Sequence, residues 1–127
     1  MKRRNVLQLL PLLAGSLSLP TIIKDNDRTK PVFVLVHGAW HGGWCWKKIK
    51  SLLNKQGYEV FTPTLTGLGE RSHLLREDIN LDTHIQDVVN VIEYEDLKNV
   101  VLVGHSYAGM VVTGVADRLP SRISHLL

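Results

Sequence analysis

The sequence has little cysteine and no long hydrophobic run. Its 127 residues contain a single cysteine, Cys45, so no disulfide can form within the chain. The longest largely apolar stretch, Val6 to Leu19, is shorter than the ~20 residues that a helix needs to cross a bilayer. The sequence therefore excludes a disulfide scaffold and predicts no stable membrane span.

Net charge is also scarce beyond the N-terminal end. Lys2, Arg3 and Arg4 account for the whole formal charge of +3. The rest of the chain is near neutral, so we expect no nucleic-acid partner. Neither a phosphate-loop lysine nor a dinucleotide-binding fingerprint is present, and His37 and His41 lack a third ligand for a metal. We therefore expect no cofactor and no metal.

The first twenty residues are laid out like a secretory signal peptide. A basic opening is followed by the apolar run and by small residues at Ser16-Leu17-Ser18. Arg3-Arg4 also resembles part of a twin-arginine signal. We expect an exported protein, periplasmic or secreted; the alternative is a disordered or amphipathic extension on a cytoplasmic one. The expected division is a signal peptide-like segment at 1–20, a linker at 21–30 and a partial domain at 31–127.

Short apolar runs alternate with amphipathic segments from residue 31 onward. Strands are predicted at 31–36, 58–63, 100–103 and 123–127, and helices at 44–56, at 81–94 with Asn80 as the cap, and from just after Ser106 to Leu119. Residues 64–80 are predicted to form a long loop. Strict alternation of strand and helix gives a parallel sheet with right-handed crossovers. The predicted fold class is therefore α/β, a parallel sheet with flanking helices.

One stretch, Val100 to Val112, joins a buried strand to a buried helix through a tight turn. Ser106 lies at the centre of this turn, with Gly104 and Ala108 two residues before and after it. Larger side chains at those two positions would collide with neighbouring backbone. Strand, tight turn with a central serine, then helix is typical of a nucleophile elbow. Ser106 is therefore a candidate nucleophile, with a buried turn holding an incidental serine as the alternative.

A second glycine-rich loop, residues 37–43, follows the first predicted strand. Because functional loops lie at the carboxyl ends of parallel strands, this loop and the turn at Ser106 are expected to converge. Acyl transfer through serine also needs N–H donors for the oxyanion. The Tyr107 N–H at the helix start is one candidate donor. The Ala39 N–H in the first loop is the other.

The sequence resembles the α/β-hydrolase superfamily over residues 31–127. Within it, the likeness is to the small esterase and hydroxynitrile-lyase group that includes plant salicylate and jasmonate methyl esterases and bacterial relatives. Three motifs carry the resemblance: Phe33-Val34-Leu35-Val36-His37-Gly38-Ala39-Trp40-His41-Gly42-Gly43-Trp44, Pro63-Thr64-Leu65-Thr66-Gly67-Leu68-Gly69-Glu70-Arg71, and Gly104-His105-Ser106-Tyr107-Ala108-Gly109. The resemblance implies Ser106 as the nucleophile and the Ala39 and Tyr107 amides as the oxyanion hole.

The resemblance also implies a small-molecule ester substrate. Gly38, Trp40 and His105 are the expected substrate-contacting residues, and the aromatic side chains hint at an apolar or aromatic acyl group. Plant hydroxynitrile lyases of this group carry a threonine hydroxyl where this chain has Gly38, which favours an esterase over a lyase. His37, His41 and His105 are expected to serve loop hydrogen bonds and packing rather than to act as a general base.

In this fold an acid and then a histidine follow the serine along the chain. After Ser106 the sequence offers only Asp117 and His125, and neither matches a triad position. We therefore expect the N-terminal half of a serine ester hydrolase that is poorly soluble and nearly inactive as these 127 residues alone. The alternatives are a degenerate hydrolase-fold protein that binds a small apolar ligand, and an enzyme similar to the hydroxynitrile lyases.

Overall fold

The computed structural model describes residues 30–127. The predicted signal peptide-like segment and all but the last residue of the predicted linker lie outside the described residues. Strands and helices alternate along the described chain as β1 (Val32–Val36), η2 (Gly43–Trp46), α2 (Lys47–Lys55), β2 (Val60–Phe61), η3 (Gly69–Leu74), α3 (Leu81–Tyr94), β3 (Val100–Gly104), α4 (Ala108–Arg118) and β4 (Ile123–Leu126).

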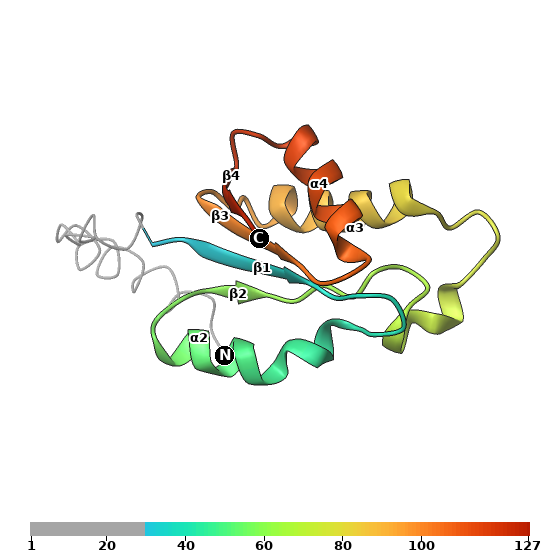
Figure 1. Cartoon of the computed structure of the whole chain (residues 1–127), viewed down its shortest axis with the longest axis horizontal. Coiled ribbons are helices and arrows are strands. Elements are labelled where there is room, and N and C mark those ends of the chain that lie inside the picture. The colour runs from blue at the N-terminus through green and yellow to red at the C-terminus, as the bar shows by residue number, and fades with distance from the viewer. Residues whose placement is uncertain (1–29) are drawn as a thin grey trace, which may run out of the picture.

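The four strands form one parallel sheet in the order β2-β1-β3-β4. β1 and β3 are adjacent at its centre and pair without a break from Val32 opposite Val100 to Val36 opposite Gly104. Helices α3 and α4 cover one face of the sheet, and α2 lies on the other (Figure 1). The predicted fold class, a parallel sheet with flanking helices, is confirmed.

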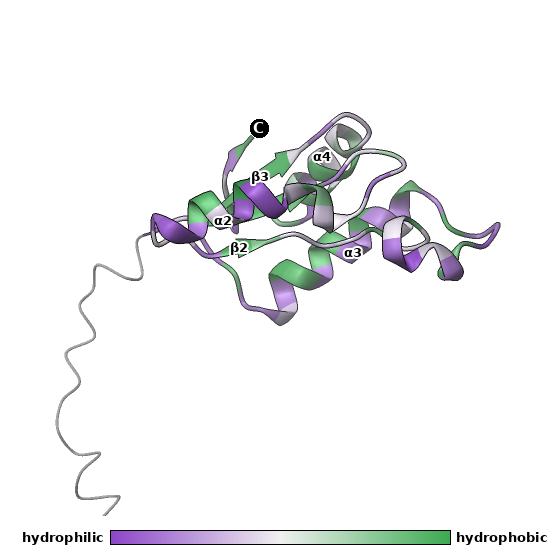
Figure 2. Ribbon diagram, turned by 90° about the horizontal axis from the view of Figure 1, so that it is seen from below, coloured by the Kyte–Doolittle hydropathy of each residue, from purple (hydrophilic) through white to green (hydrophobic). Residues whose placement is uncertain are grey.

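The core lies between the sheet and the pair α3 and α4. Val34, Val36, Leu102, Val111 and Val115 are completely buried there. Figure 2 shows hydrophobic residues along β3, whereas α2 carries hydrophobic and hydrophilic turns side by side. The valine-rich strands suit this position because β-branched side chains pack well on a buried sheet.

The bounds of α3 agree with the prediction from sequence. Asn80 accepts the backbone N–H of Thr83 through its side chain, and the Thr83 hydroxyl accepts the N–H of Asn80, which completes a capping box. Its apolar stripe is buried at Ile85, Val88, Val89 and Ile92. Leu81, also predicted on this face, is 37% exposed because it lies in the first turn, at the rim of the core.

The helix predicted at 44–56 differs from the structure in two respects. The segment begins as the 3-10 helix η2 and continues as the shorter α2. No residue of α2 is buried, and Ile49 and Leu52 are 43% and 55% exposed. α2 packs beside β2, which has two residues instead of the predicted six, so the described elements cover the apolar face of α2 only in part.

Two further predictions need correction. The predicted loop 64–80 contains η3, and Met110 on α4 is 56% exposed although burial was expected. Met110 lies on the exposed face of α4, whereas Ala108, Val111 and Val112 beside it in the same part of the helix are buried. Within residues 30–127, no helix is both long and apolar enough to cross a membrane.

Candidate active site

Ser106 occupies the turn between β3 and α4 and adopts a backbone conformation that side chains rarely accept. Its φ is 56°, in the left-handed region, and such strain persists only where the surroundings enforce it. A Cβ at Gly104 would lie 2.8 Å from both the Ala108 carbonyl oxygen and Val112 Cγ2. Ala108 is itself completely buried. The predicted need for small residues around the serine is therefore met in the structure.

The loop after β1 lies directly against this turn. The His105 N–H donates to the Val36 carbonyl at 3.1 Å, which extends the pairing of β1 and β3 into both loops. A Cβ at Gly38 would lie 3.0 Å from His105 Nδ1 and 3.4 Å from Ser106 Cβ. The predicted convergence of the two loops is thus observed, and Gly38 is the point of closest approach.

Two backbone donors flank the serine and are not used elsewhere in the described part of the chain. Within residues 30–127, neither the Ala39 N–H nor the Tyr107 N–H has a hydrogen-bond partner. Tyr107 immediately precedes α4, so its N–H also points along the positive end of that helix dipole. Unpaired N–H groups at such a position favour a negatively charged oxygen.

His37 is fully buried and both of its ring nitrogens are occupied. Nε2 accepts the Leu65 N–H at 3.0 Å, so Nδ1 carries the proton and donates to the Gly38 carbonyl oxygen at 2.8 Å. Burial lowers the pKa of His37, because desolvation disfavours the charged ring. His41 Nδ1 likewise lies 2.9 Å from the Ala39 carbonyl oxygen. Both histidines serve loop hydrogen bonds.

A polar cluster joins the first loop to the segment after β2. The Thr64 hydroxyl accepts the Gly43 N–H at 2.8 Å and donates to Glu70 Oε1 at 2.5 Å. Arg71 donates to the Thr64 carbonyl oxygen at 2.9 Å. The Thr64 hydroxyl is the main reason that the pKa of the Glu70 carboxyl is lowered. This cluster holds the loop that carries Gly38 and Ala39.

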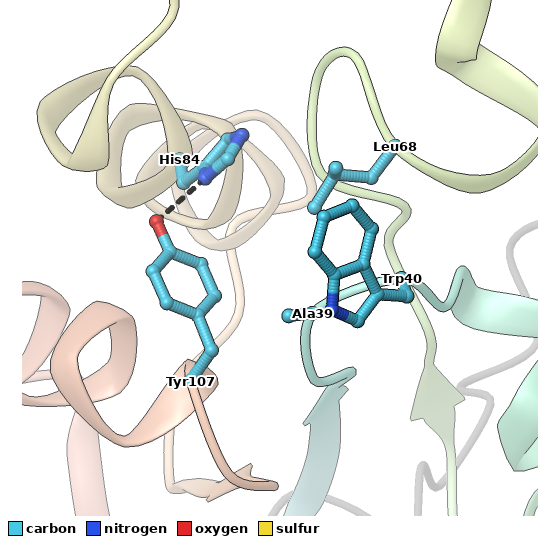
Figure 3. A pocket seen from close by; sticks show the side chains of 5 residues that line it. All are labelled: Ala39, Trp40, Leu68, His84 and Tyr107. Atoms are coloured by element: carbon cyan, nitrogen blue, oxygen red, sulfur yellow. Dashed lines mark hydrogen bonds between the residues drawn. The ribbon is translucent and has the colours of Figure 1, made fainter.

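A cavity of about 160 Å³ opens at Tyr107, the residue after Ser106. Ala39, Trp40, Leu68, His84 and Tyr107 line it (Figure 3). Of the expected substrate-contacting residues, the structure places Trp40 in this wall, Gly38 against the serine, and His105 exposed at the turn. Trp40 is 90% exposed and has a φ of 65°, so it extends from a strained backbone over the cavity.

His84 is the functional candidate that the sequence alone did not indicate. It is buried on α3, and its Nδ1 lies 2.8 Å from the Tyr107 hydroxyl, while its Nε2 lies 2.8 Å from the Thr66 carbonyl oxygen. The available signal was its position four residues before Val88, on the apolar face of the predicted helix. A buried histidine there needs polar partners from a neighbouring element.

Within residues 30–127, no imidazole or carboxylate is hydrogen-bonded to the Ser106 hydroxyl. Asp117 is exposed on α4, and His125 is exposed on β4, with Nδ1 3.2 Å from the Ser124 hydroxyl. The structure therefore does not bring either residue to the serine. In the same part of the chain, no three His, Cys, Asp or Glu side chains gather in a way that could hold a metal ion.

The model of the alpha/beta hydrolase family matches residues 33–127, which is most of the chain. The chain belongs to the alpha/beta hydrolase family. Carbendazim hydrolyzing esterase from Nocardioides sp. (strain SG-4G) is 58% identical over 95 residues, which cover 75% of this chain and 39% of that protein. Methylesterase 8 from Arabidopsis thaliana is 32% identical over 110 residues, 86% of this chain and 40% of that protein.

Solved structures of hydrolases agree with this assignment. An extracellular alpha/beta-hydrolase from a Paenibacillus species matches with a TM-score of 0.70 at 33% identity, over 76% of this chain and 39% of that one. Polyneuridine aldehyde esterase matches with a TM-score of 0.69 at 33% identity, over 76% of this chain and 38% of that one. The chain thus spans about 40% of the length of the hydrolases it resembles. These relatives are named as esterases, so the chain resembles carboxylic-ester hydrolases.

Proposed function

We propose that this chain supplies the nucleophile and the oxyanion-binding groups of a serine ester hydrolase. The observation that carries the proposal is the left-handed backbone of Ser106, φ 56°, at a strand-to-helix turn against which Gly38 packs. We infer that this conformation lifts the hydroxyl off the sheet, where a substrate can reach it. The resemblance to named esterases supports ester hydrolysis as the reaction.

In the proposed reaction, the Ser106 oxygen attacks the ester carbonyl and loses its proton to a base. The N–H groups of Ala39 and Tyr107 stabilise the oxyanion, each contributing roughly 10²–10³ in rate. The alcohol then leaves with a proton, and an acyl group remains on the serine. Water attacks this acyl-enzyme, releases the carboxylic acid and restores the hydroxyl.

We propose that the base and its orienting acid come from a part of the fold that these residues do not include. The fold places both after the nucleophile in the chain, and the matched relatives are more than twice as long as the matched segment. With residues 1–127 alone we expect very slow turnover, because loss of one triad member costs up to ~10⁶ in rate.

For the substrate, we propose a small uncharged ester, and carbendazim is the first compound to test. Its choice rests on the name of the Nocardioides relative, which is 58% identical to this chain. A second candidate function is a hydrolase-fold protein that binds a small apolar ligand without turnover. The unpartnered Ser106 hydroxyl within residues 30–127 is the observation in its favour.

The complete gene provides the test. An aspartate or glutamate and a histidine in frame beyond Leu127 favour the esterase, and a stop codon directly after Leu127 favours the ligand-binding protein. The product of the complete gene should hydrolyse p-nitrophenyl esters, and Ser106→Ala should lower kcat at least ~10³-fold. Ser51→Ala, at an exposed serine of α2, is the matched control and should keep wild-type activity. Equal hydrolysis by wild type and Ser106→Ala contradicts the proposal.

We also propose that residues 1–20 direct export. Sequencing of the mature N-terminus after expression in a bacterium with a functional secretion pathway tests this. Cleavage near residue 20 supports the proposal, and an intact Met1 on cytosolic protein contradicts it.

A further inference from the structure

We propose that His84 and Tyr107 form a specificity-determining pair, which keeps the cavity beside Ser106 apolar and so selects an unsubstituted apolar group of about the size of one ring. The inference rests on the proposed function, because it concerns the cavity in which the ester's apolar group would lie. The ring nitrogens of His84 and the hydroxyl proton of Tyr107 are used in hydrogen bonds within the protein, so they are not available to a ligand.

The proton positions follow from the partners of His84. The Thr66 carbonyl oxygen can only accept, so Nε2 carries a proton and donates to it at 2.8 Å. In the neutral ring Nδ1 is then an acceptor, and the Tyr107 hydroxyl donates to it at 2.8 Å (Figure 3). Both ring nitrogens and the phenolic proton are therefore committed to partners within the protein.

The pair is held firmly in place. The rings of His84 and Tyr107 meet edge to face, with centroids 5.7 Å apart and an interplanar angle of 85°. Thr66 is held from the same helix, since its N–H and hydroxyl donate to the two Asp87 carboxylate oxygens at 2.6 Å and 2.7 Å. Helix α3 thus fixes the histidine, the loop that the histidine bonds, and through them the ring of Tyr107.

The remaining wall is hydrocarbon, from Ala39, Trp40 and Leu68, and the cavity surface is almost entirely apolar. Its volume of about 160 Å³ has room for a group of about one ring, although the cavity is open to solvent on one side. A polar substituent that lies against its apolar wall loses part of its hydration without gaining a hydrogen bond. The wild-type protein should therefore bind a bare ring in preference to a hydroxylated one.

Breaking the pair should reverse part of this preference. In His84→Phe both the Tyr107 hydroxyl and the Thr66 carbonyl oxygen lose their partner, and in Tyr107→Phe the His84 Nδ1 loses its partner. Each variant therefore leaves at least one unpaired polar atom of the pair at the cavity. A hydroxyl on the ligand can then pair with that atom. A hydrogen bond between neutral groups contributes ~0.5–1.5 kcal/mol, which corresponds to a gain of ~2–12-fold for the hydroxylated ligand.

The experiment measures the Kd values of toluene and phenol by the change in tryptophan fluorescence, with Trp40→Phe as the control that the signal comes from the cavity. We expect the wild type to bind toluene at least ~10-fold more tightly than phenol. His84→Phe and Tyr107→Phe should each lower this ratio at least ~3-fold, mainly through tighter phenol binding. Thr113→Val is the control, because it removes a hydroxyl on an exposed face of α4 that bonds only the Gly109 carbonyl oxygen, and its ratio should remain at the wild-type value.

The inference is overturned if the wild type shows no preference for toluene, if it binds neither probe, or if both pair variants keep the wild-type ratio. Should His84→Phe fail to fold, as judged by thermal unfolding, Tyr107→Phe decides the matter alone. Neither probe is an ester, so a failure of ester hydrolysis would sink the proposed function and leave this result intact. Conversely, the wild type could be a fully active esterase while both pair variants keep its preference for toluene over phenol. That result would contradict the role of the pair and support the proposed function.

Discussion

The Nε2 of His37 accepts the backbone N–H of Leu65 at 3.0 Å, across 28 residues of chain. This hydrogen bond joins the loop after β1 to the segment after β2. Because Nδ1 of the same ring donates to the Gly38 carbonyl oxygen, the position of Gly38 depends on a neutral imidazole. A protonated ring could not accept from Leu65.

The buried His37 predicts a pH dependence of stability. Its pKa in the folded protein lies below the ordinary value of 6.5, so below about that pH the unfolded chain binds a proton that the folded chain does not. The free energy of unfolding should therefore fall as the pH falls through 6.5, and His37 should contribute no slope above it. Urea unfolding between pH ~5 and ~8 measures this. His37→Gln should flatten the slope, and an unchanged slope in that variant would falsify the assignment.

Gly38→Ala should impair the site while Gly109→Ala should not. The new Cβ at position 38 meets the His105 carbonyl oxygen at 3.1 Å and Ser106 Cβ at 3.4 Å, so one of the two loops must shift. The required shift is a few tenths of an ångström, so kcat/KM should fall, by less than the ~10² that a 1 Å displacement of a catalytic group can cost. No atom lies within 4 Å of a Cβ at Gly109, in the first turn of α4, and alanine there should stabilise the helix by up to ~1 kcal/mol. Esterase kinetics and thermal unfolding of both variants test the contrast.

Thr64→Val should destabilise the protein by ~1–3 kcal/mol, because it leaves the buried Gly43 N–H without an acceptor. It also removes the hydroxyl that donates to Glu70, so the pKa of Glu70 should return toward its ordinary value. Thr113→Val is the control, since that hydroxyl bonds the Gly109 carbonyl oxygen on an exposed face, and the expected change is within ~0.5 kcal/mol. Equal losses in the two variants, measured by urea unfolding, would argue against the Thr64 cluster.

Trp40→Gly should raise stability and lower activity together. The backbone at Trp40 has a φ of 65°, and the side chain is 90% exposed, so glycine removes strain at little cost in packing. The expected gain is up to ~1 kcal/mol. The same change removes one wall of the cavity, so KM for an aromatic ester should rise several-fold with a smaller effect on kcat. A loss of stability would indicate that the indole packs more than its exposure suggests.

The sequence predicted well the parts of the fold whose stabilising contacts are local or lie within the core. The bounds of α3 followed from one apolar stripe and the Asn80 cap. The turn at Ser106 followed from the small residues at Gly104 and Ala108, whose packing the structure confirms. Convergence of the two loops followed from parallel strand order alone.

What the sequence did not reveal depends on partners that are distant in the chain. The apolar pattern at Ile49 and Leu52 predicted a helix but not whether anything covers it. His84 and Tyr107 are 23 residues apart in the chain, and no local sequence pattern predicts their hydrogen bond. Met110 was assigned to the core because it continues an apolar run, although Ala108, Val111 and Val112 occupy the buried face of α4 and Met110 lies outside that face.

The uninterrupted register from Val32 opposite Val100 to Val36 opposite Gly104 has a kinetic consequence. Gly38 and Ser106 meet only after two strands separated by more than sixty residues have paired, and such long-range pairings form slowly in folding. Intermediates that already contain α3 or the Asn80 cap would therefore have no preformed site. Recovery of ligand binding during refolding should coincide with the final cooperative step rather than with the early gain of helix.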